Sequence, residues 1–312
     1  MKVLVAGATG ALGRQLVPRL VEAGHGVTGM TRTEGKRELV RQLGATPMVA
    51  DALEPEQVAQ AVAEAEPEVI VHQLTALPGN LDWRNFDRTF ALTNRLRTAG
   101  TDNLLAAGRA VEARRFIAQS FAGWPYARAG AWIKSEEQPF DADPPASMRE
   151  TLGALRYLER AVTEAEWTEG IVLRYGGFYG PGTSLTPDGE LAEVIRKRRF
   201  PVVGSGDGIS SFIQIEDAAE ATVAAIERGR PGIYNVVDDE PLPAREWLPV
   251  LAEALGAKPP RRVPRWLGRL LAGEAATVMM TEVRGASNQK AKRELDWKPG
   301  HPSLRVGFAA MA

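Results

Sequence analysis

Three glycines at regular spacing lie near the start of the chain, at Gly7, Gly10 and Gly13. An apolar run precedes them and a helical pattern follows, which is the context that a phosphate-binding loop requires. In such a loop the first glycine permits a tight turn, the second lets the backbone approach a diphosphate, and the third lets the helix pack on the sheet. The free N–H groups at the start of that helix attract phosphate. The spacing therefore predicts a dinucleotide site, with a purely structural turn as the alternative.

Positive charge follows about twenty residues after the glycines, where a carboxylate would bind the ribose hydroxyls of NAD. The residues at this point, which ends the second expected strand, are Thr31, Arg32 and Thr33. A guanidinium suits a 2′-phosphate through charge-assisted hydrogen bonds. The sequence thus favours NADP(H) over NAD(H), unless Arg32 is a solvated surface charge or only stacks on the adenine. Asp51, which ends the third expected strand, is predicted either to receive the adenine amino group or to cap the helix that begins at Pro55.

The elements that must hold these residues alternate between short apolar runs and longer helical patterns. Nearly continuous runs of Val, Ile and Leu are typical of parallel strands buried on both faces. Strands are predicted at 2–6, 26–30, 46–50, 68–72, 115–119, 170–173 and 233–237. Helices are predicted at 12–23, 34–43, 55–65, roughly 87–108 and roughly 147–166, and one more is expected to be N-capped by Asp217. This alternation indicates an α/β fold built on a Rossmann-type doubly wound parallel sheet.

The second half of the chain is less regular, and it predicts a division into two parts. Gly, Pro, Ser and Thr are concentrated at 176–189. We expect a dinucleotide-binding Rossmann domain over 1–176, to which 212–237 returns. A smaller C-terminal substrate lobe is then formed by 177–211 and 238–312.

One basic and aromatic stretch, 260–271, lies within the expected lobe. Its apolar residues have helical spacing, which favours a helix that docks Trp266, Leu267, Leu270 and Leu271 on the core. The alternatives are that its arginines hold a substrate phosphate or that the segment lies on an acidic membrane surface.

Composition excludes several other kinds of protein. The 312 residues carry 38 Lys and Arg against 39 Asp and Glu, and a formal net charge of −1 is not that of a general nucleic-acid binder. With no cysteine and three scattered histidines, neither a disulfide framework nor a metal site is predicted. No apolar run approaches the roughly eighteen residues that cross a bilayer, and the first residues lack a signal-peptide pattern. We expect a cytoplasmic protein that binds neither nucleic acid nor membrane.

Short motifs along most of the chain resemble the extended short-chain dehydrogenase/reductases, a family of NAD(P)-dependent epimerases, dehydratases and reductases. Besides the glycine loop, the matching segments are 69–72, 100–105, 115–120, 173–182, 212–217, 234–237 and 288–299. The resemblance implies a nicotinamide cofactor and a small-molecule substrate, with phosphorylated and nucleotide-linked compounds as candidates. Because many relatives pair through the long helices of the sheet domain, it also implies a homodimer. The predicted cofactor contacts are Gly7, Thr9, Gly10, Ala11, Leu12, Gly13, Arg32, Asp51, Ala52, Gln73, Leu74, Thr75, Ser120, Tyr175, Gly176 and Phe178.

The chain departs from the family at its catalytic position. Members carry Tyr-x-x-x-Lys, in which the lysine lowers the pKa of the tyrosine so that it exchanges a proton with a carbonyl. None of the five tyrosines of this chain is followed four residues later by lysine. If Glu159 matches the glutamate that lies eight residues past the family's tyrosine, Thr151 and Leu155 replace the pair.

The resemblance identifies Ser120 as the strand-end residue that holds a substrate oxygen, with a structural serine as the alternative. Tyr126, Tyr175 and Tyr179 are candidates for a substitute proton donor, although such tyrosines more often pack their rings and bond their hydroxyls to backbone. We therefore expect an NADP(H)-dependent oxidoreductase that acts on a carbonyl or secondary alcohol with a non-standard proton donor. The alternatives are an epimerase or dehydratase that retains its cofactor, and a catalytically silent NADP-binding sensor.

Overall fold

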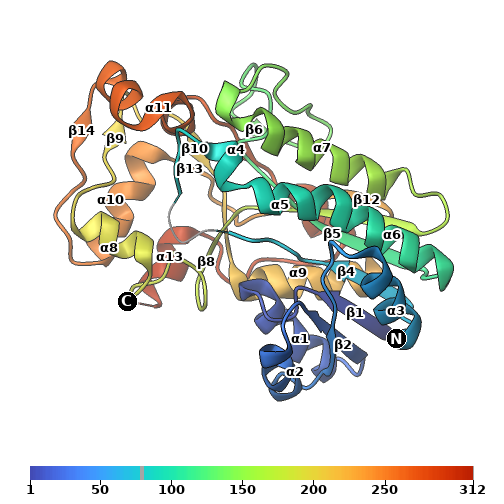
Figure 1. Ribbon diagram of the computed structural model, residues 1–312. Coiled ribbons are helices and arrows are strands. Elements are labelled where there is room, and N and C mark those ends of the chain that lie inside the picture. Colours follow the sequence, from blue (N-terminus) through green and yellow to red (C-terminus); the bar gives the residue numbers. More distant parts are fainter. Residues whose placement is uncertain (78–80, 312) are drawn as a thin grey trace.

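The computed structural model describes residues 1–77 and 81–311, and a seven-stranded parallel sheet lies at its centre (Figure 1). The strands are β1 (Lys2–Ala6), β2 (Gly26–Thr31), β3 (Thr46–Val49), β4 (Val69–His72), β5 (Arg115–Phe121), β7 (Glu169–Tyr175) and β12 (Gly232–Val236). They follow the order β12-β7-β5-β4-β1-β2-β3. From β1 the chain builds the sheet in one direction through β2 and β3, and from β4 in the other through β5, β7 and β12. At the end of β1, Ala6 pairs with Met30 of β2 on one side and with His72 of β4 on the other. The predicted Rossmann-type doubly wound sheet is thereby confirmed.

Alternate residues of each strand face opposite layers of helices, because successive side chains of a strand point to opposite faces. In β1, Val3 and Val5 belong to one buried cluster, whereas Leu4 and Ala6 belong to another. The first cluster is covered by α1 (Ala11–Glu22) and α9 (Ile215–Arg228), and the second by α3 (Pro55–Ala65), α6 (Thr101–Ala110) and α7 (Arg149–Thr163). A turn at Glu34–Lys36 and α2 (Arg37–Gln42) connect β2 to β3.

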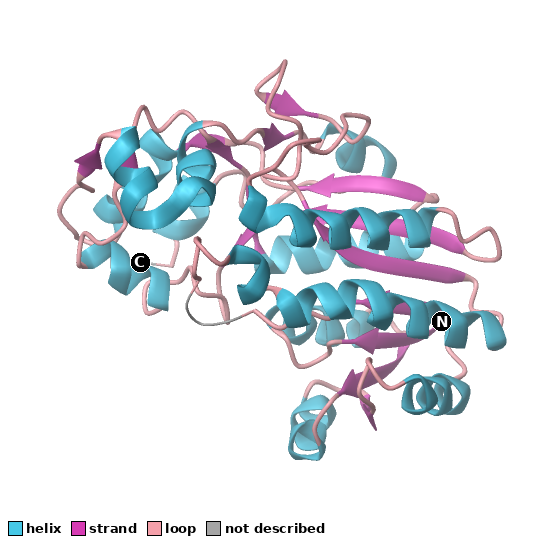
Figure 2. Cartoon of the chain, turned by 45° about the horizontal axis from the view of Figure 1, so that its top comes forward, coloured by secondary structure: helices cyan, strands magenta, loops and turns pink. Residues whose placement is uncertain are grey.

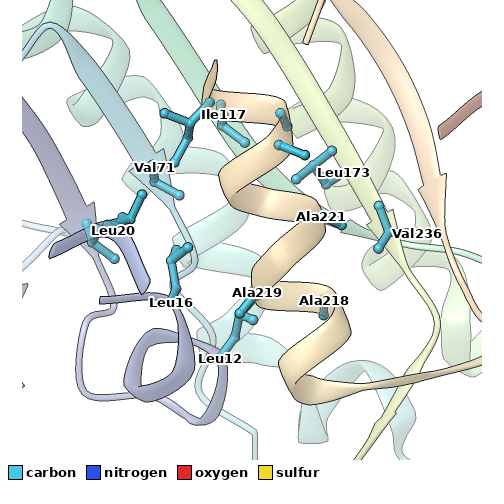
Figure 3. Close-up of a cluster of buried hydrophobic side chains, with 14 of the residues drawn as sticks. Leu12, Leu16, Leu20, Val71, Ile117, Leu173, Ala218, Ala219, Ala221 and Val236 are labelled. Atoms are coloured by element: carbon cyan, nitrogen blue, oxygen red, sulfur yellow. The ribbon is translucent and has the colours of Figure 1, made fainter. Parts of the chain in front are cut away.

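The packing of α1 on α9 depends on small side chains. Figure 3 shows Leu12 and Leu16 of α1 facing Ala218 and Ala219 of α9, and all four are buried. Alanine lets the two helix backbones approach closely while still removing apolar surface from water. The first helix, which begins at the glycine loop, is thus fixed against the rest of the fold.

The single helix predicted at roughly 87–108 is wrong in one respect, since the segment is interrupted. It consists of α4 (Phe86–Thr89), α5 (Ala91–Arg95), a π-helical turn (Leu96–Gly100) and α6. In the π-helical region the hydroxyls of Thr98 and Thr101 donate to the carbonyls of Asn94 and Arg97, at 3.0 and 2.8 Å. Such side-chain bonds to the preceding turn bend helices, which periodicity alone does not reveal.

The prediction that Asp217 caps a helix was wrong. The helix α9 begins at Ile215, and its N-cap is Gln214, whose side-chain oxygen accepts the N–H groups of Glu216 and Asp217. The carboxylate of Asp217 instead accepts the N–H groups of Gly300 and His301 at 3.0 and 2.8 Å. Since Gln214 caps the helix, the carboxylate of Asp217 is free to bind the segment at Gly300 and His301 to α9.

A second core lies beside the large sheet and joins elements from the C-terminal half (Figure 2). Its longer helices are α8 (Glu190–Arg196), α10 (Ala244–Ala254), α11 (Arg265–Thr281) and α13 (Leu304–Ala309). Short strand pairs accompany them: β8 (Gly177–Tyr179) with β11 (Phe212–Gln214), β9 (Val202–Val203) with β14 (Arg262–Val263), β10 (Ile209–Ser210) with β13 (Leu242–Pro243), and β6 (Ile133–Lys134) with β15 (Gly285–Ala286). The remaining helical segments are a turn at Ala146–Met148 and α12 (Gln289–Glu294). Of the segment 212–237, β12 joins the large sheet and α9 packs on α1, whereas β11 pairs with β8 outside that sheet.

The first half of α11 does not dock on the core as predicted. Trp266, Leu270 and Leu271 are 68%, 64% and 64% exposed, and of the four predicted residues only Leu267 is partly buried. Gly268 packs against Val203. The prediction of a helix here was correct, but the side of the helix that faces the core is the one that carries Gly268. Every helix in the described part of the chain is too short or too polar to span a membrane.

Candidate functional site

The glycine loop has a backbone that other residues would disrupt. Gly7 adopts a φ of +99°, and a Cβ there would lie 2.8 Å from the carbonyl oxygen of Gln73. At Gly13 a Cβ would lie 2.3 Å from the carbonyl oxygen of Gly7. The loop therefore folds tightly onto β4 and α1, as the sequence predicts.

The helix α1 begins directly after this loop, with Gly10 as its N-cap and no capping side chain among the described residues. A glycine here leaves the N–H groups of the first turn open, whereas the side chain of Ser, Thr, Asp or Asn at the cap would accept from them. The first turn, which contains Ala11, Leu12 and Gly13, is therefore available to an anion.

A pocket of about 260 Å³ opens beside Gly7 and Gly10 at the carboxyl ends of β1 to β4. Nine of the predicted cofactor contacts line it: Gly7, Thr9, Gly10, Arg32, Asp51, Ala52, Gln73, Leu74 and Thr75. Other lining residues were not predicted as contacts: Met30, Thr31, Thr33, Lys36, Ala50, Leu53, Ala76 and Leu96. Most of them lie beside predicted contacts at strand ends, and that position is the signal that could have found them. The other seven predicted contacts do not line this pocket: Ala11, Leu12, Gly13, Ser120, Tyr175, Gly176 and Phe178.

Positive charge lies at one end of the pocket. Arg32 and Lys36 line it and are exposed, and within residues 1–77 and 81–311 neither forms an ion pair. Arg37 instead pairs with Glu34 at 2.9 Å. The pocket thus offers two cations to an anionic group near the ends of β2 and β3.

Asp51 lies at the same end of the pocket, and its contacts decide whether it caps α3, which was one of its two predicted roles. Its carboxylate accepts the N–H of Leu53 at 3.0 Å, whereas the N-cap of α3 is Glu54. The interpretation of Asp51 as the cap of that helix was therefore wrong, because the chain makes a local turn before the helix begins. Its predicted contact with adenine remains a prediction.

Gln73 lines the pocket where β4 ends, and His72 lies buried directly before it. Burial lowers the pKa of His72 to about 4, so its ring is neutral. The ring accepts the N–H of Leu74 at Nδ1 and lies 3.2 Å from the Leu96 carbonyl at Nε2. His72 therefore holds the pocket loop in place. Gln73 has a buried side-chain oxygen without a partner among the described residues, which fits a site that receives a donor from a bound group.

Ser120, the residue before the last in β5, lies in a buried charged network and has no free hydroxyl. It donates to Glu159 Oε1 at 2.6 Å, and Glu159 pairs with Arg174 through bonds of 2.6 and 2.8 Å. The side chains of Glu159 and Arg174 are 7% and 6% exposed. Although burial opposes its charge, the contact with Glu159 raises the pKa of Arg174 above its usual value.

The three tyrosines predicted as proton donors are all buried, and each hydroxyl is bonded within the protein. Tyr126 donates to Asn235 Oδ1 at 2.6 Å, Tyr179 donates to the Ser303 carbonyl at 3.2 Å, and Tyr175 lies 2.7 Å from the hydroxyl of Thr222. Burial raises the pKa of each above its usual value. The structure does not bring these hydroxyls together at one point.

Thr151 and Leu155 lie on the buried face of α7. They are the residues that the family resemblance places where other members carry the catalytic tyrosine and lysine. The hydroxyl of Thr151 donates to Asp87 Oδ1 at 2.7 Å and accepts from Asn94 Nδ2 at 3.1 Å. Asp87 also accepts the N–H groups of Glu150 and Thr151 at the start of α7. Sequence reasoning missed Asp87, because it lies some distance along the chain on α4 and no local pattern links it to α7.

Comparison with known proteins agrees with this arrangement. The sequence model of the NAD dependent epimerase/dehydratase family matches residues 3–236. A Streptomyces protein named 3-diazoavenalumate denitrifying reductase is 44% identical over 309 residues, which are 99% of this chain and 99% of that protein. The 2-alkyl-3-oxoalkanoate reductase of Stenotrophomonas maltophilia is 31% identical over 270 residues, covering 82% of this chain and 76% of that protein. Among solved structures, the UDP-glucose 4-epimerase of Thermus thermophilus in complex with NAD matches with a TM-score of 0.75 and 25% identity, over 100% of this chain and 97% of that one.

Proposed function

The chain belongs to the NAD dependent epimerase/dehydratase family, and from that premise we propose that it is an NADPH-dependent reductase that replaces a diazonium group by hydrogen. Family membership and the named reductases among its relatives make it an NAD(P)-dependent oxidoreductase or epimerase. The choice of a diazo substrate is supported by the relative that is 44% identical along 99% of both chains, whose name describes a reductase that removes nitrogen from a diazo compound. The observation that carries the proposal is the bonding of the hydroxyls at the site.

Four of the candidate hydroxyls give their hydrogen to a neighbouring acceptor, and that of Tyr175 lies 2.7 Å from the hydroxyl of Thr222. Ser120 donates to Glu159, and Thr151 donates to Asp87. Tyr126 and Tyr179 donate to Asn235 and to the Ser303 carbonyl. A ketone needs a proton on its oxygen as hydride arrives, and a positioned acid normally supplies it. These hydroxyls are poorly arranged for that task.

A diazonium group does not need that proton, because it already carries a positive charge. When bound, NADPH supplies one hydride, and one hydride added to R–N2⁺ gives R–H and N2 with atoms and charge in balance. The oxygen of Ser120 keeps lone pairs while its hydrogen is held by Glu159. An electron-rich oxygen stabilises a cationic electrophile, whereas it would repel a developing alkoxide.

The residues that line the pocket suit the chemical groups of NADPH. The open first turn of α1 can bind an anion, the glycines leave room for a diphosphate, and Gln73 offers a buried acceptor that has no partner among the described residues. Arg32 and Lys36 would hold the 2′-phosphate of NADPH, and their lack of ion pairs within the described residues supports NADPH over NADH.

A substrate panel tests the proposed reaction. The purified chain is given NADPH with benzenediazonium or with a 2-alkyl-3-oxoalkanoate, and enzyme-dependent oxidation of NADPH is measured for each. We expect turnover of the diazonium ion with a kcat/KM at least about tenfold above that of the ketone, a difference of about 1.4 kcal/mol in transition-state stabilisation. Reduction of the ketone alone would instead favour the second candidate.

That second candidate is ketone reduction, which the relative from Stenotrophomonas favours at 31% identity. An epimerase would behave differently from both, because it would retain cofactor through purification and show no net oxidation of NADPH. The absorbance spectrum of the purified chain distinguishes it.

A further inference from the structure

Five aromatic side chains form a connected group outside the cofactor pocket, which we call the aromatic wall: Trp83, Phe86, Phe90, Phe121 and Trp124. The ring of Phe86 stacks on those of Phe90 and Trp83, with centroids 4.5 and 5.8 Å apart. The edge of Trp124 meets Phe86 at 5.6 Å, and Phe121 lies 6.4 Å from Trp124. These separations are those at which aromatic rings attract one another.

The segments that form the wall also carry residues of the proposed reaction site. Phe121 follows Ser120 directly at the end of β5, and Trp124 lies three residues later. Phe86 precedes Asp87, the residue that accepts the hydroxyl and N–H of Thr151. The wall therefore joins the β5 end to the start of α7, whose preceding residue Met148 packs in the same cluster.

The wall is only partly buried, although aromatic rings gain most when removed from water. Phe86 is buried, whereas Trp83, Phe90, Phe121 and Trp124 are partly exposed. Ligand sites are lined in this way, by apolar and aromatic side chains with a few polar groups close by. The polar residues next in sequence are Ser120, beside Phe121, and Asp87, beside Phe86, and each is hydrogen-bonded within the protein.

We propose that the aromatic wall binds the planar aromatic ring that carries the diazonium group, so that the substrates of this chain are arenediazonium ions. This inference rests on the proposed function. A diazonium group withdraws electrons from its ring, and the electron-rich faces of Trp and Phe attract an electron-poor or cationic partner. Conjugation with an aromatic ring also stabilises the carbon–nitrogen bond of the ion, whereas an alkyl diazonium ion loses N2 at once. The wall thus matches the carbon skeleton on which the reacting group persists.

The test measures binding, so it does not depend on turnover. Calorimetry on the full chain with NADP⁺ compares nitrobenzene, which is planar and electron-poor, with nitrocyclohexane, which is its saturated counterpart. We expect nitrobenzene to bind about two- to tenfold more tightly, the range that one aromatic pair contributes. Trp124→Leu should abolish this preference, because leucine fills space without an aromatic face, whereas Trp124→Phe should retain it.

Trp132→Ala is the matched control, since Trp132 is 44% exposed, stacks on Arg284 and lies outside the wall. The preference should be unchanged in this variant. Equal binding of the two compounds by the wild type, or a preference that survives in Trp124→Leu, would overturn the inference. A ring preference that depends on Trp124 without any reduction of diazonium ions would leave the wall standing and refute the proposed reaction.

Discussion

The hydroxyl of Ser120 donates a 2.6 Å hydrogen bond to the carboxylate of Glu159, although the family resemblance expects a residue that faces the substrate at this position near the end of β5. Glu159 is itself held by Arg174 in a buried pair. A hydroxyl beside a carboxylate keeps its O–H directed at that carboxylate, since charge-assisted hydrogen bonds are about twice as strong as neutral ones. Ser120 is therefore positioned to accept and not to donate.

Ser120→Ala should lower kcat for a diazonium substrate by less than about tenfold, whereas removal of a proton donor costs about 10² to 10⁴. The same variant should lower the free energy of unfolding by about 1–3 kcal/mol, because Glu159 loses a buried partner. Steady-state kinetics and urea unfolding measure the two effects.

Ser135→Ala is the control for that variant, because Ser135 makes the same type of bond to Glu137 at the surface. It should change the free energy of unfolding by no more than about 0.5 kcal/mol. A loss of kcat above about a hundredfold in Ser120→Ala with its fold intact would identify Ser120 as a proton donor and contradict the account.

Glu159→Gln should destabilise the fold by about 3–5 kcal/mol, because it leaves the buried guanidinium of Arg174 uncompensated. The midpoint and slope of urea unfolding give this value. Glu193→Gln is the matched control: its pair with Lys197 is exposed, at 64% and 53%, and should contribute little to the free energy of unfolding. Equal effects of the two substitutions would show that the Glu159 pair is not important for stability.

Arg32→Ala should weaken NADPH binding by about ten- to a hundredfold, the range of a lost charged hydrogen bond of about 1.5–3 kcal/mol. NADH lacks the 2′-phosphate, so its affinity should change by less than about twofold. Fluorescence titration with both nucleotides measures the difference. Arg37→Ala is the control, because Arg37 already pairs with Glu34 and does not line the pocket. An equal loss for NADPH and NADH in Arg32→Ala would mean that Arg32 does not select the phosphate.

The buried neutral ring of His72 should make stability depend on pH. Its pKa is about 4 in the fold against 6.5 in the unfolded chain, so the unfolded chain binds more protons between these values. Its contribution is fully present above pH 6.5 and is lost as the pH falls towards 4, a change of about 3 kcal/mol at 1.36 kcal/mol per pKa unit. The free energy of unfolding, measured with urea at several pH values in this range, should depend less steeply on pH for His72→Gln than for the wild type. An equally steep pH dependence in the two proteins would mean that the pKa of His72 does not change on folding.

Local features of the sequence predicted the sheet and its glycine loop, because buried parallel strands and close backbone contacts restrict residue type directly. Gly7, for example, is fixed by its own φ and by the carbonyl of Gln73. Contacts between distant segments were not predictable in this way. Asp87 bonds Thr151 across 64 positions, and Asp217 holds Gly300 across 83. The exposure of Trp266 likewise follows from which face of α11 meets Val203, which helical periodicity does not determine.

The most direct test of the account is the stoichiometry of nitrogen release. The purified chain is mixed with limiting NADPH and an excess of a nitrogen-isotope-labelled benzenediazonium ion, and labelled N2, benzene and NADP⁺ are quantified against a sample without protein. The account predicts protein-dependent formation of one N2 and one benzene for each NADPH oxidised. Oxidation of NADPH without N2 release, or no protein-dependent reaction while NADPH binds tightly, would contradict it.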